Sequence, residues 1–151
     1  MSDDGSSGSY VTRRNIEFQH CDPAGIVFYP RYFELLNSVI EEWFGARNNL
    51  PFREMHGPAR RGVPTVHLDT TFKAPSRLGD VVDFEIIVRK IGGSSVDLTI
   101  RCTGDEELRF YCEQTLVFID NDTGKPTRWT DDLRQRLSAQ LQTPDPSGNG
   151  I

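Results

Sequence analysis

Hydrophobic residues recur at helical spacing through one long stretch near the middle of the chain. Between residues 30 and 46 they fall on one broad side, and charged residues occupy much of the other. The apolar side is formed by Tyr32, Phe33, Leu36, Val39, Ile40, Trp43 and Phe44. Gly45 fits a stop signal at the end of this stretch. The pattern predicts one long helix wrapped by a curved sheet, because aromatic stripes are core far more often than cofactor sites.

A second pattern, the alternation of apolar and polar residues, predicts strands on both sides of this helix. Before the helix, residues 10–19 alternate, with Ile16 and Phe18 on the same face. After it, alternation recurs in residues 63–73, 80–91, 95–103 and 107–120. Because short turns that contain glycine separate consecutive strands, we expect the later four to form an antiparallel meander.

The other segments complete the predicted architecture. Residues 48–61 are irregular and contain Pro51, Gly57 and Pro58, whereas residues 130–141 suit a short polar helix. The ends are rich in Ser, Gly and Pro, so we expect a disordered tail over residues 1–9 and a flexible tail over 142–151. The predicted fold is α+β, with one domain over residues 10–141. A curved five-stranded antiparallel sheet wraps around one long central helix, and a short C-terminal helix follows.

Composition and charge narrow the function class. A chain of 151 residues suits one domain, and its net charge of −5 argues against nucleic-acid binding by bulk electrostatics. No apolar run of about 18 residues occurs, so we expect no membrane span. The polar, acidic N-terminus differs from a signal peptide. An odd number of cysteines, three, suits a reducing cytoplasm, and the meander would place Cys102 near Leu108 rather than opposite Cys112.

The loop between the first strand and the long helix carries the candidate chemistry. Asp22 precedes a Pro-Ala-Gly turn that supplies no cation, and the residues that follow are too apolar for an ordinary surface loop. Pro30 suits the first helical position, so the free amides near Phe28 and Tyr29 would lie at a helix N-terminus. Acyl transfer needs such a nucleophile or base together with donors for an oxyanion. The alternative is that Asp22 serves only as a turn or cap residue.

Rival chemistries at the same loop have less support. His20, Cys21 and Asp22 are adjacent, and three adjacent residues rarely converge on one metal. No other part of the chain offers ligands at zinc-type spacing, so we expect no metal site. Cys21 as a nucleophile would need a positioned base, but neighbouring side chains in an extended segment point to opposite faces.

A resemblance to a known family rests on residues 20–32, which read HCDPAGIVFYPRY. This segment resembles the active-site segment of hotdog-fold acyl-CoA thioesterases, and is closest to the 4-hydroxybenzoyl-CoA thioesterase type with a catalytic Asp. The strand order and the turn at residues 75–80 extend the resemblance over about residues 10–120. It implies that Asp22 attacks the thioester or activates water, and that the Tyr29 backbone amide polarises the carbonyl. One branch of the superfamily has a His where Tyr29 stands, and that His is absent here.

Substrate contacts are predicted with less detail. An acyl pocket would be lined by the loop and the helix, through Gly25, Phe28, Trp43 and Phe52. Thr70 or Thr71 would orient water or the carbonyl from a partner subunit. The connector at residues 48–61 is either a solvated link or a lid over that pocket.

Coenzyme A is polyanionic, so an acidic chain needs a local basic patch to bind it. Candidate CoA-binding residues surround one turn: Arg89, Lys90, Gly92, Ser94 and Ser95. The alternative is an ordinary hairpin turn whose cations keep an edge of the sheet soluble, and Arg60 with Arg61 forms a weaker second patch. Coenzyme A enters only as part of substrate and product, and no separate cofactor is expected.

The resulting hypothesis is hydrolysis of an aromatic or other small acyl-CoA to free acid and CoA. The five strands leave two exposed edges, so we expect a homodimer, and the resemblance implies interface sites and often a homotetramer. We expect no nucleic-acid or membrane partner. The alternatives are a non-catalytic module that binds acyl-CoA or acyl-carrier protein, a hydratase or dehydratase that would need a catalytic His, and a structural dimer.

Overall fold

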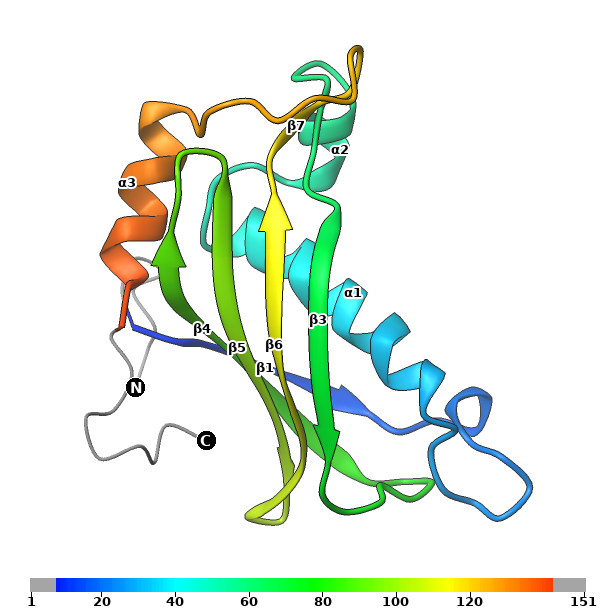
Figure 1. Ribbon diagram of the computed structural model, residues 1–151. Helices are drawn as coiled ribbons and strands as arrows, with labels where there is room; N and C mark the ends of the chain where they lie inside the picture. The colour runs from blue at the N-terminus through cyan, green and yellow to red at the C-terminus, as the bar shows by residue number, and fades with distance from the viewer. Residues whose placement is uncertain (1–7, 143–151) are drawn as a thin grey trace.

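The computed structural model describes residues 8–142. Of the predicted tails, 1–9 and 142–151, all but residues 8, 9 and 142 lie outside that range. A five-stranded antiparallel sheet curves around one long helix (Figure 1). The strands are β1 (Tyr10–Asn15), β2 (Arg61–Gly62), β3 (Thr65–Phe72), β4 (Val81–Ile91), β5 (Ser95–Gly104), β6 (Glu107–Val117) and β7 (Ile119–Asp120). The helices are the 3-10 turn η1 (Phe18–His20), α1 (Pro30–Ala46), α2 (Phe52–His56) and α3 (Asp131–Gln140).

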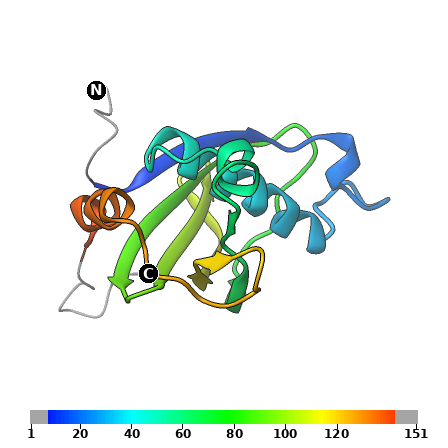
Figure 2. The ribbon, with the colours of Figure 1, turned by 90° about the horizontal axis from the view of Figure 1, so that it is seen from above.

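Helix α1 has the bounds that the hydrophobic period predicts. It begins at Pro30, where a missing N–H costs nothing, and its 17 residues extend about 25 Å. Its buried side faces the sheet and consists of Tyr32, Leu35, Leu36, Val39, Ile40, Trp43 and Phe44. The short helix α3 was also predicted, and Thr130 caps it by accepting a hydrogen bond from the Leu133 amide. Figure 2 shows α3 beside β4.

The strand order is β1-β4-β5-β6-β3, which corrects the expected meander. Only β4, β5 and β6 follow one another as hairpins. Strand β3 pairs with β6 and forms an edge of the sheet. The eight residues 73–80 between β3 and β4 are too long for a tight turn, so these two strands need not be neighbours. These residues instead carry the chain past β6 and β5 to β4.

Two local predictions were wrong for identifiable reasons. Ile16 is buried as expected, but strand β1 ends before it and Phe18 lies in η1 with 82% of its surface exposed. Cys102 lies opposite Phe110 rather than Leu108, because an extra residue, Arg109, bulges out of β6 at that point. Cys21, Cys102 and Cys112 are free thiols.

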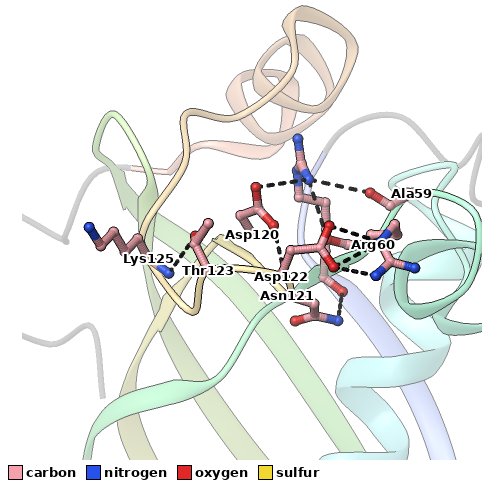
Figure 3. A network of polar contacts seen from close by, with 8 residues as sticks. Ala59, Arg60, Asp120, Asn121, Asp122, Thr123 and Lys125 are labelled. Atoms are coloured by element: carbon pink, nitrogen blue, oxygen red, sulfur yellow. Dashed lines mark hydrogen bonds and ion pairs between the residues drawn. The ribbon is translucent and has the colours of Figure 1, made fainter.

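The connector between α1 and β3 is ordered rather than irregular. It contains α2, and its end forms β2, which pairs with β7 in a second, two-stranded sheet. Figure 3 shows the pair of Arg60 and Asp122, in which two arginine nitrogens bind the carboxylate. Arg61 Nη1 lies 3.8 Å from Asp120 Oδ2. These four residues, which we call the clamp, fix the connector to the end of β6. No helix within residues 8–142 is long and apolar enough to cross a membrane.

Candidate active site

Asp22 sits in a tight turn with one carboxylate oxygen available. The Gly25 amide donates to the Asp22 carbonyl at 2.9 Å, and Gly25 has the positive φ of 80° that this turn requires. The Ala24 amide donates to Asp22 Oδ1 at 2.8 Å. Within residues 8–142 no cation pairs with Asp22, and its second oxygen has no hydrogen-bond donor. Asp22 is half-buried, and the turn holds its carboxylate in place while one carboxylate oxygen has no partner among the described residues.

The start of α1 leaves one backbone donor open. The Phe28 amide is occupied because it donates to the His20 carbonyl at 3.0 Å, which corrects the expectation that this amide is free. Pro30 has no N–H, and the Tyr29 amide has no acceptor among the described residues. Tyr29 is the N-cap of α1, where the helix dipole favours negative charge. Its amide is therefore the donor best placed to stabilise an oxyanion.

The loop is held from below by the chain around Ser76. The Val27 amide donates to the Ser76 carbonyl at 2.9 Å, and the Leu78 amide donates to the Gly25 carbonyl at 3.0 Å. The Ser76 hydroxyl is fully buried and accepts from Tyr32 Oη of α1 at 2.8 Å. The Asp22 loop and the start of α1 thus share one support.

A buried arginine completes this support. Arg109, 4% exposed, donates from Nη1 to Asp80 Oδ2 at 2.8 Å and to Ser76 Oγ at 3.0 Å. These hydrogen bonds, followed by one from the Arg77 amide, hold the pKa of the Asp80 carboxyl below its ordinary value. We call Arg109, Asp80, Ser76 and Tyr32 the brace. Sequence reasoning missed Arg109, because a bulge in β6 turns its side chain inward against the alternation of the strand.

The neighbouring residues do not form a rival site. Burial, and then the charges of Asp22 and Asp80, raise the pKa of the Cys21 thiol, which disfavours a thiolate nucleophile. His20 is buried, and its Nδ1 accepts from the Glu17 amide at 2.8 Å, so this nitrogen is occupied. No group of three or more potential metal ligands occurs in the described part of the chain.

Aromatic side chains gather between this loop and the end of β3. Phe28 and Tyr29 are 48% and 58% exposed, and the rings of Tyr29 and Phe72 meet edge to face at 6.0 Å. Tyr29 and Phe72 border a shallow cleft of about 330 Å³ that also reaches Tyr32 and Lys73. An aryl group placed here would meet the aromatic rings, with one cation, Lys73, at the same cleft.

A second groove, of about 500 Å³, lies between α1 and the other end of β3. Six of its lining residues are Asn37, Ile40, Phe52, Val63, Thr65 and Gln114. We call it the α1–β3 groove. Phe52 reaches it from α2, so the connector forms a fixed wall of the groove.

The other predicted substrate contacts, Thr70, Thr71 and Trp43, lie in different parts of the molecule. Thr70 and Thr71 are half-buried on β3 and point to opposite faces, with Thr70 beside the Cys112 thiol of β6. Trp43 corrects the prediction of a pocket residue. It is fully buried near the far end of α1, and its indole N–H donates to Gln140 at 2.9 Å. Trp43 therefore joins α1 to α3.

The predicted CoA turn lies at the opposite end of the sheet from Asp22 (Figure 1). The 11 residues of β4 separate the two ends by about 35 Å. Arg89 donates to Thr99 at 3.0 Å, whereas Lys90 is exposed. The Gly92 amide donates to the Ser95 carbonyl at 2.8 Å, and the Ser94 carbonyl accepts from Phe118 at 2.7 Å.

The second predicted cationic patch is neutralised. Arg60 and Arg61 are both engaged by the aspartates of the clamp. The β4–β5 turn therefore remains the better candidate for phosphate binding, and one chain alone cannot bring it to Asp22.

Comparison with known proteins places this site in a family. The model of the thioesterase-like superfamily matches residues 16–137, which span the loop, α1, strands β2 to β7 and most of α3. The chain belongs to the thioesterase-like superfamily. This membership confirms the predicted hotdog fold and the predicted enzyme class, a thioester hydrolase.

Named relatives of this thioesterase-like protein agree with that assignment. A 4-hydroxybenzoyl-CoA thioesterase from a Pseudomonas species is 28% identical, over 76% of this chain and 85% of the relative. A 1,4-dihydroxy-2-naphthoyl-CoA hydrolase from Nostoc punctiforme is 24% identical, over 85% of this chain and 86% of the relative. The crystal structure of a 1,4-dihydroxy-2-naphthoyl-CoA thioesterase from Synechocystis has a TM-score of 0.78 at 16% identity, covering 87% of this chain and 96% of that one. That likeness shows the shared fold.

Proposed function

We propose that this protein hydrolyses the thioester of a small aromatic acyl-CoA, with Asp22 as nucleophile or general base. The observation that carries the proposal is the pairing of an acid that has no cation with the open Tyr29 amide on the same short loop. The amide would donate to the thioester oxygen and stabilise the negative charge that develops there.

Two routes remain for Asp22. In the first, its carboxylate oxygen bonds to the acyl carbon, the CoA thiolate leaves, and water hydrolyses the mixed anhydride. In the second, Asp22 takes a proton from water, and the resulting hydroxide attacks the acyl carbon. Both routes end with free acid and CoA, and neither needs a metal or a resident cofactor.

An aromatic acyl group is supported by two observations. Tyr29 and Phe72 present exposed rings beside the loop. The named relatives act on 4-hydroxybenzoyl-CoA and 1,4-dihydroxy-2-naphthoyl-CoA, both of which are aryl thioesters.

We further propose that two copies join through β3. This strand pairs on one side only, and its exposed apolar residues Val66, Leu68 and Phe72 are unusual for a free edge. If both α1 helices lie on the same face of the joined sheet, a two-fold axis makes the two β3 strands antiparallel. The Phe72 end of one copy then lies beside the Thr65 end of the other.

This pairing would complete the site. The Asp22 loop lies at the Phe72 end of β3, through Tyr29. The α1–β3 groove and the β4–β5 turn lie at the Thr65 end. The dimer would therefore bring the loop of one copy to the groove and the CoA turn of its partner. Assembly into a tetramer and a cytoplasmic location stay predictions.

Release of free thiol from a panel of aromatic and aliphatic acyl-CoAs tests the reaction. Asp22→Asn keeps the turn, because its Oδ1 still accepts from Ala24, and we expect it to lower kcat by at least about 100-fold. The matched control is Asp105→Asn, in an exposed turn whose positive φ of 49° suits Asn. An Asp22→Asn variant as active as wild type would refute the role of Asp22.

The route is resolved by a single turnover in ¹⁸O-labelled water. Label incorporated into Asp22 establishes the anhydride route with water attacking the Asp22 carbonyl, because a general base does not exchange its oxygens. Label found only in the product acid excludes that attack and is the result expected for the general base. Tight acyl-CoA binding without any thiol release would instead favour a non-catalytic binding module.

A further inference from the structure

One buried glutamine has an amide oxygen with no partner. Gln114 lies on β6 in the row of side chains that faces α1, between Cys112 and Leu116, and is 3% exposed. Its Nε2 donates to Thr65 Oγ1 at 2.9 Å. Its Oε1 is buried and has no hydrogen-bond partner among the described residues.

A second buried glutamine shows what a satisfied side chain looks like in this fold. Gln140 is 1% exposed, its Oε1 accepts from Trp43 at 2.9 Å, and its Nε2 donates to Asn48 at 2.8 Å. Buried acceptors are normally paired, and an orphan one is costly. Gln114 is therefore an exception that calls for a partner from outside the chain.

The location of Gln114 indicates where that partner would come from. Gln114 lines the α1–β3 groove, whose walls also include the apolar side chains of Ile40 and Phe52. Two acids of α1, Glu34 and Glu41, border the same groove. An apolar group that carries a hydrogen-bond donor fits these walls, whereas a carboxylate would be repelled by the acids.

We propose that Gln114 selects acyl groups whose far end carries a hydrogen-bond donor, such as a hydroxyl or amino group. The donor would bond to Gln114 Oε1, and Thr65 would hold the amide in the orientation that presents this oxygen. The inference rests on the proposed function, because it assigns the groove of one copy to the acyl group attacked by Asp22 of the other.

Three thioesters of similar size separate donor from acceptor: benzoyl-CoA, 4-methoxybenzoyl-CoA and 4-aminobenzoyl-CoA. We expect kcat/KM for the amino compound to exceed the other two by about 10- to 100-fold, because binding sites built for a donor reject analogues that lack it. In Gln114→Leu this ratio should fall to about 1, through loss on the amino compound and not on benzoyl-CoA. Leucine fits the space of the glutamine. The only hydrogen bond lost is the one from Gln114 Nε2 to Thr65 Oγ1, and Thr65 is exposed.

Gln140→Leu is the matched control. It removes the satisfied buried glutamine, so it should lower thermal stability while keeping the preference for the amino compound. A Gln114→Leu variant that keeps the preference, or that loses activity equally on all three thioesters, would overturn the assignment. A wild-type preference for the methoxy compound would overturn it as well.

Binding to Asp22→Asn separates the inference from the proposed reaction. Calorimetry would compare two thioethers that cannot be hydrolysed, 4-hydroxyphenacyl-CoA and phenacyl-CoA. A preference of about tenfold for the hydroxyl compound, lost on adding Gln114→Leu, supports the inference even if no thioester is hydrolysed. Hydrolysis of all three thioesters with equal affinity for the two thioethers would leave the proposed function standing and refute the role of Gln114.

Discussion

The brace and the clamp do the same job at opposite ends of the molecule. Each uses arginine and aspartate to fasten an irregular segment to β6 or its extension. In the brace, the Arg109 side chain is 5% exposed and bonds to Asp80 and Ser76. In the clamp, the side chains of Arg60 and Asp122 are 66% and 52% exposed, although they are paired through two nitrogens.

The difference in burial decides how much each arrangement should matter. Water and salt screen the exposed pairs of the clamp, and holding long side chains together costs entropy, so such pairs contribute little. A buried charge that loses its partner has no water to replace it, so breaking the pair is strongly destabilising. The number of ion pairs is therefore a poor guide, and the single buried arginine should count for more than two exposed ones.

Removing Arg109 should have the largest effect. Arg109→Met keeps the bulk but removes the arginine donor from Asp80 and Ser76, which keep only the Arg77 amide and the Tyr32 hydroxyl. We expect a loss of about 3 kcal/mol in unfolding free energy. The Asp22 loop, which Ser76 supports, should become more mobile, so kcat should also fall. Urea denaturation measures the first effect, with Arg60→Met as the matched control. Equal losses for the two variants would contradict the comparison.

A smaller effect should follow from the hydroxyl that links α1 to the brace. Tyr32→Phe keeps the ring contact with Phe110 but removes the bond to Ser76, and should cost about 1 kcal/mol. Because the loop amide of Val27 binds the same residue, kcat should fall while KM changes little. Unchanged kcat together with the loss of stability would assign Tyr32 to the fold alone.

The two regions should also differ in their response to pH and salt. The pKa values of Asp80 and Asp122 are both held below the ordinary value, in each case mainly by hydrogen bonds from an arginine. A lowered carboxyl pKa in the folded state stabilises the protein above the unfolded pKa of about 3.9, and this stabilisation is lost as pH falls through the lower folded pKa. We expect the loss in wild type and not in Arg109→Met. High salt should leave this loss of stability at low pH largely unchanged, because the Arg109–Asp80 pair is buried. If high salt abolished the loss, the exposed ion pairs of the clamp would be its source.

The smallest effect should come from the clamp itself. Asp122→Asn removes the exposed ion pair, while the backbone pairing of β2 with β7 remains. We expect no change in urea midpoint beyond experimental error at physiological salt. A midpoint shift as large as that of Arg109→Met would show that the clamp carries stability that its exposure does not suggest.

The sequence predicts the features that depend on neighbouring residues. The period of α1, the cap at Thr130 and the turn at Asp22 are local, and each lies where its pattern indicates. Features set by distant pairing were missed. The position of β3 depends on its pairing with β6, about 40 residues later in the chain. Arg109 faces inward only because a bulge reverses its direction.

The candidate site residues also fall into those placed by local sequence and those placed by distant packing. Asp22 and the Tyr29 amide lie on one short loop, so sequence order alone brings them together. Trp43 and Gln114 show the limit of such reasoning. An aromatic residue on a helix can line a pocket or join the core, and only the position of α3 decides for Trp43. Gln114 is one polar residue in an alternating strand, and its orphan oxygen is visible only in three dimensions.

The central claim, that each site combines the loop of one copy with the groove of another, has a direct test. Asp22→Asn disables the loop, and Asn37→Trp should fill the groove from an exposed position on α1. The two variants are produced together with different tags, and the mixed dimer is isolated by two successive affinity steps. Each variant alone should be inactive, whereas the mixed dimer should have about half the wild-type activity, because one of its two sites is intact. A mixed dimer with no activity would place loop and groove of one site in the same chain and contradict the claim.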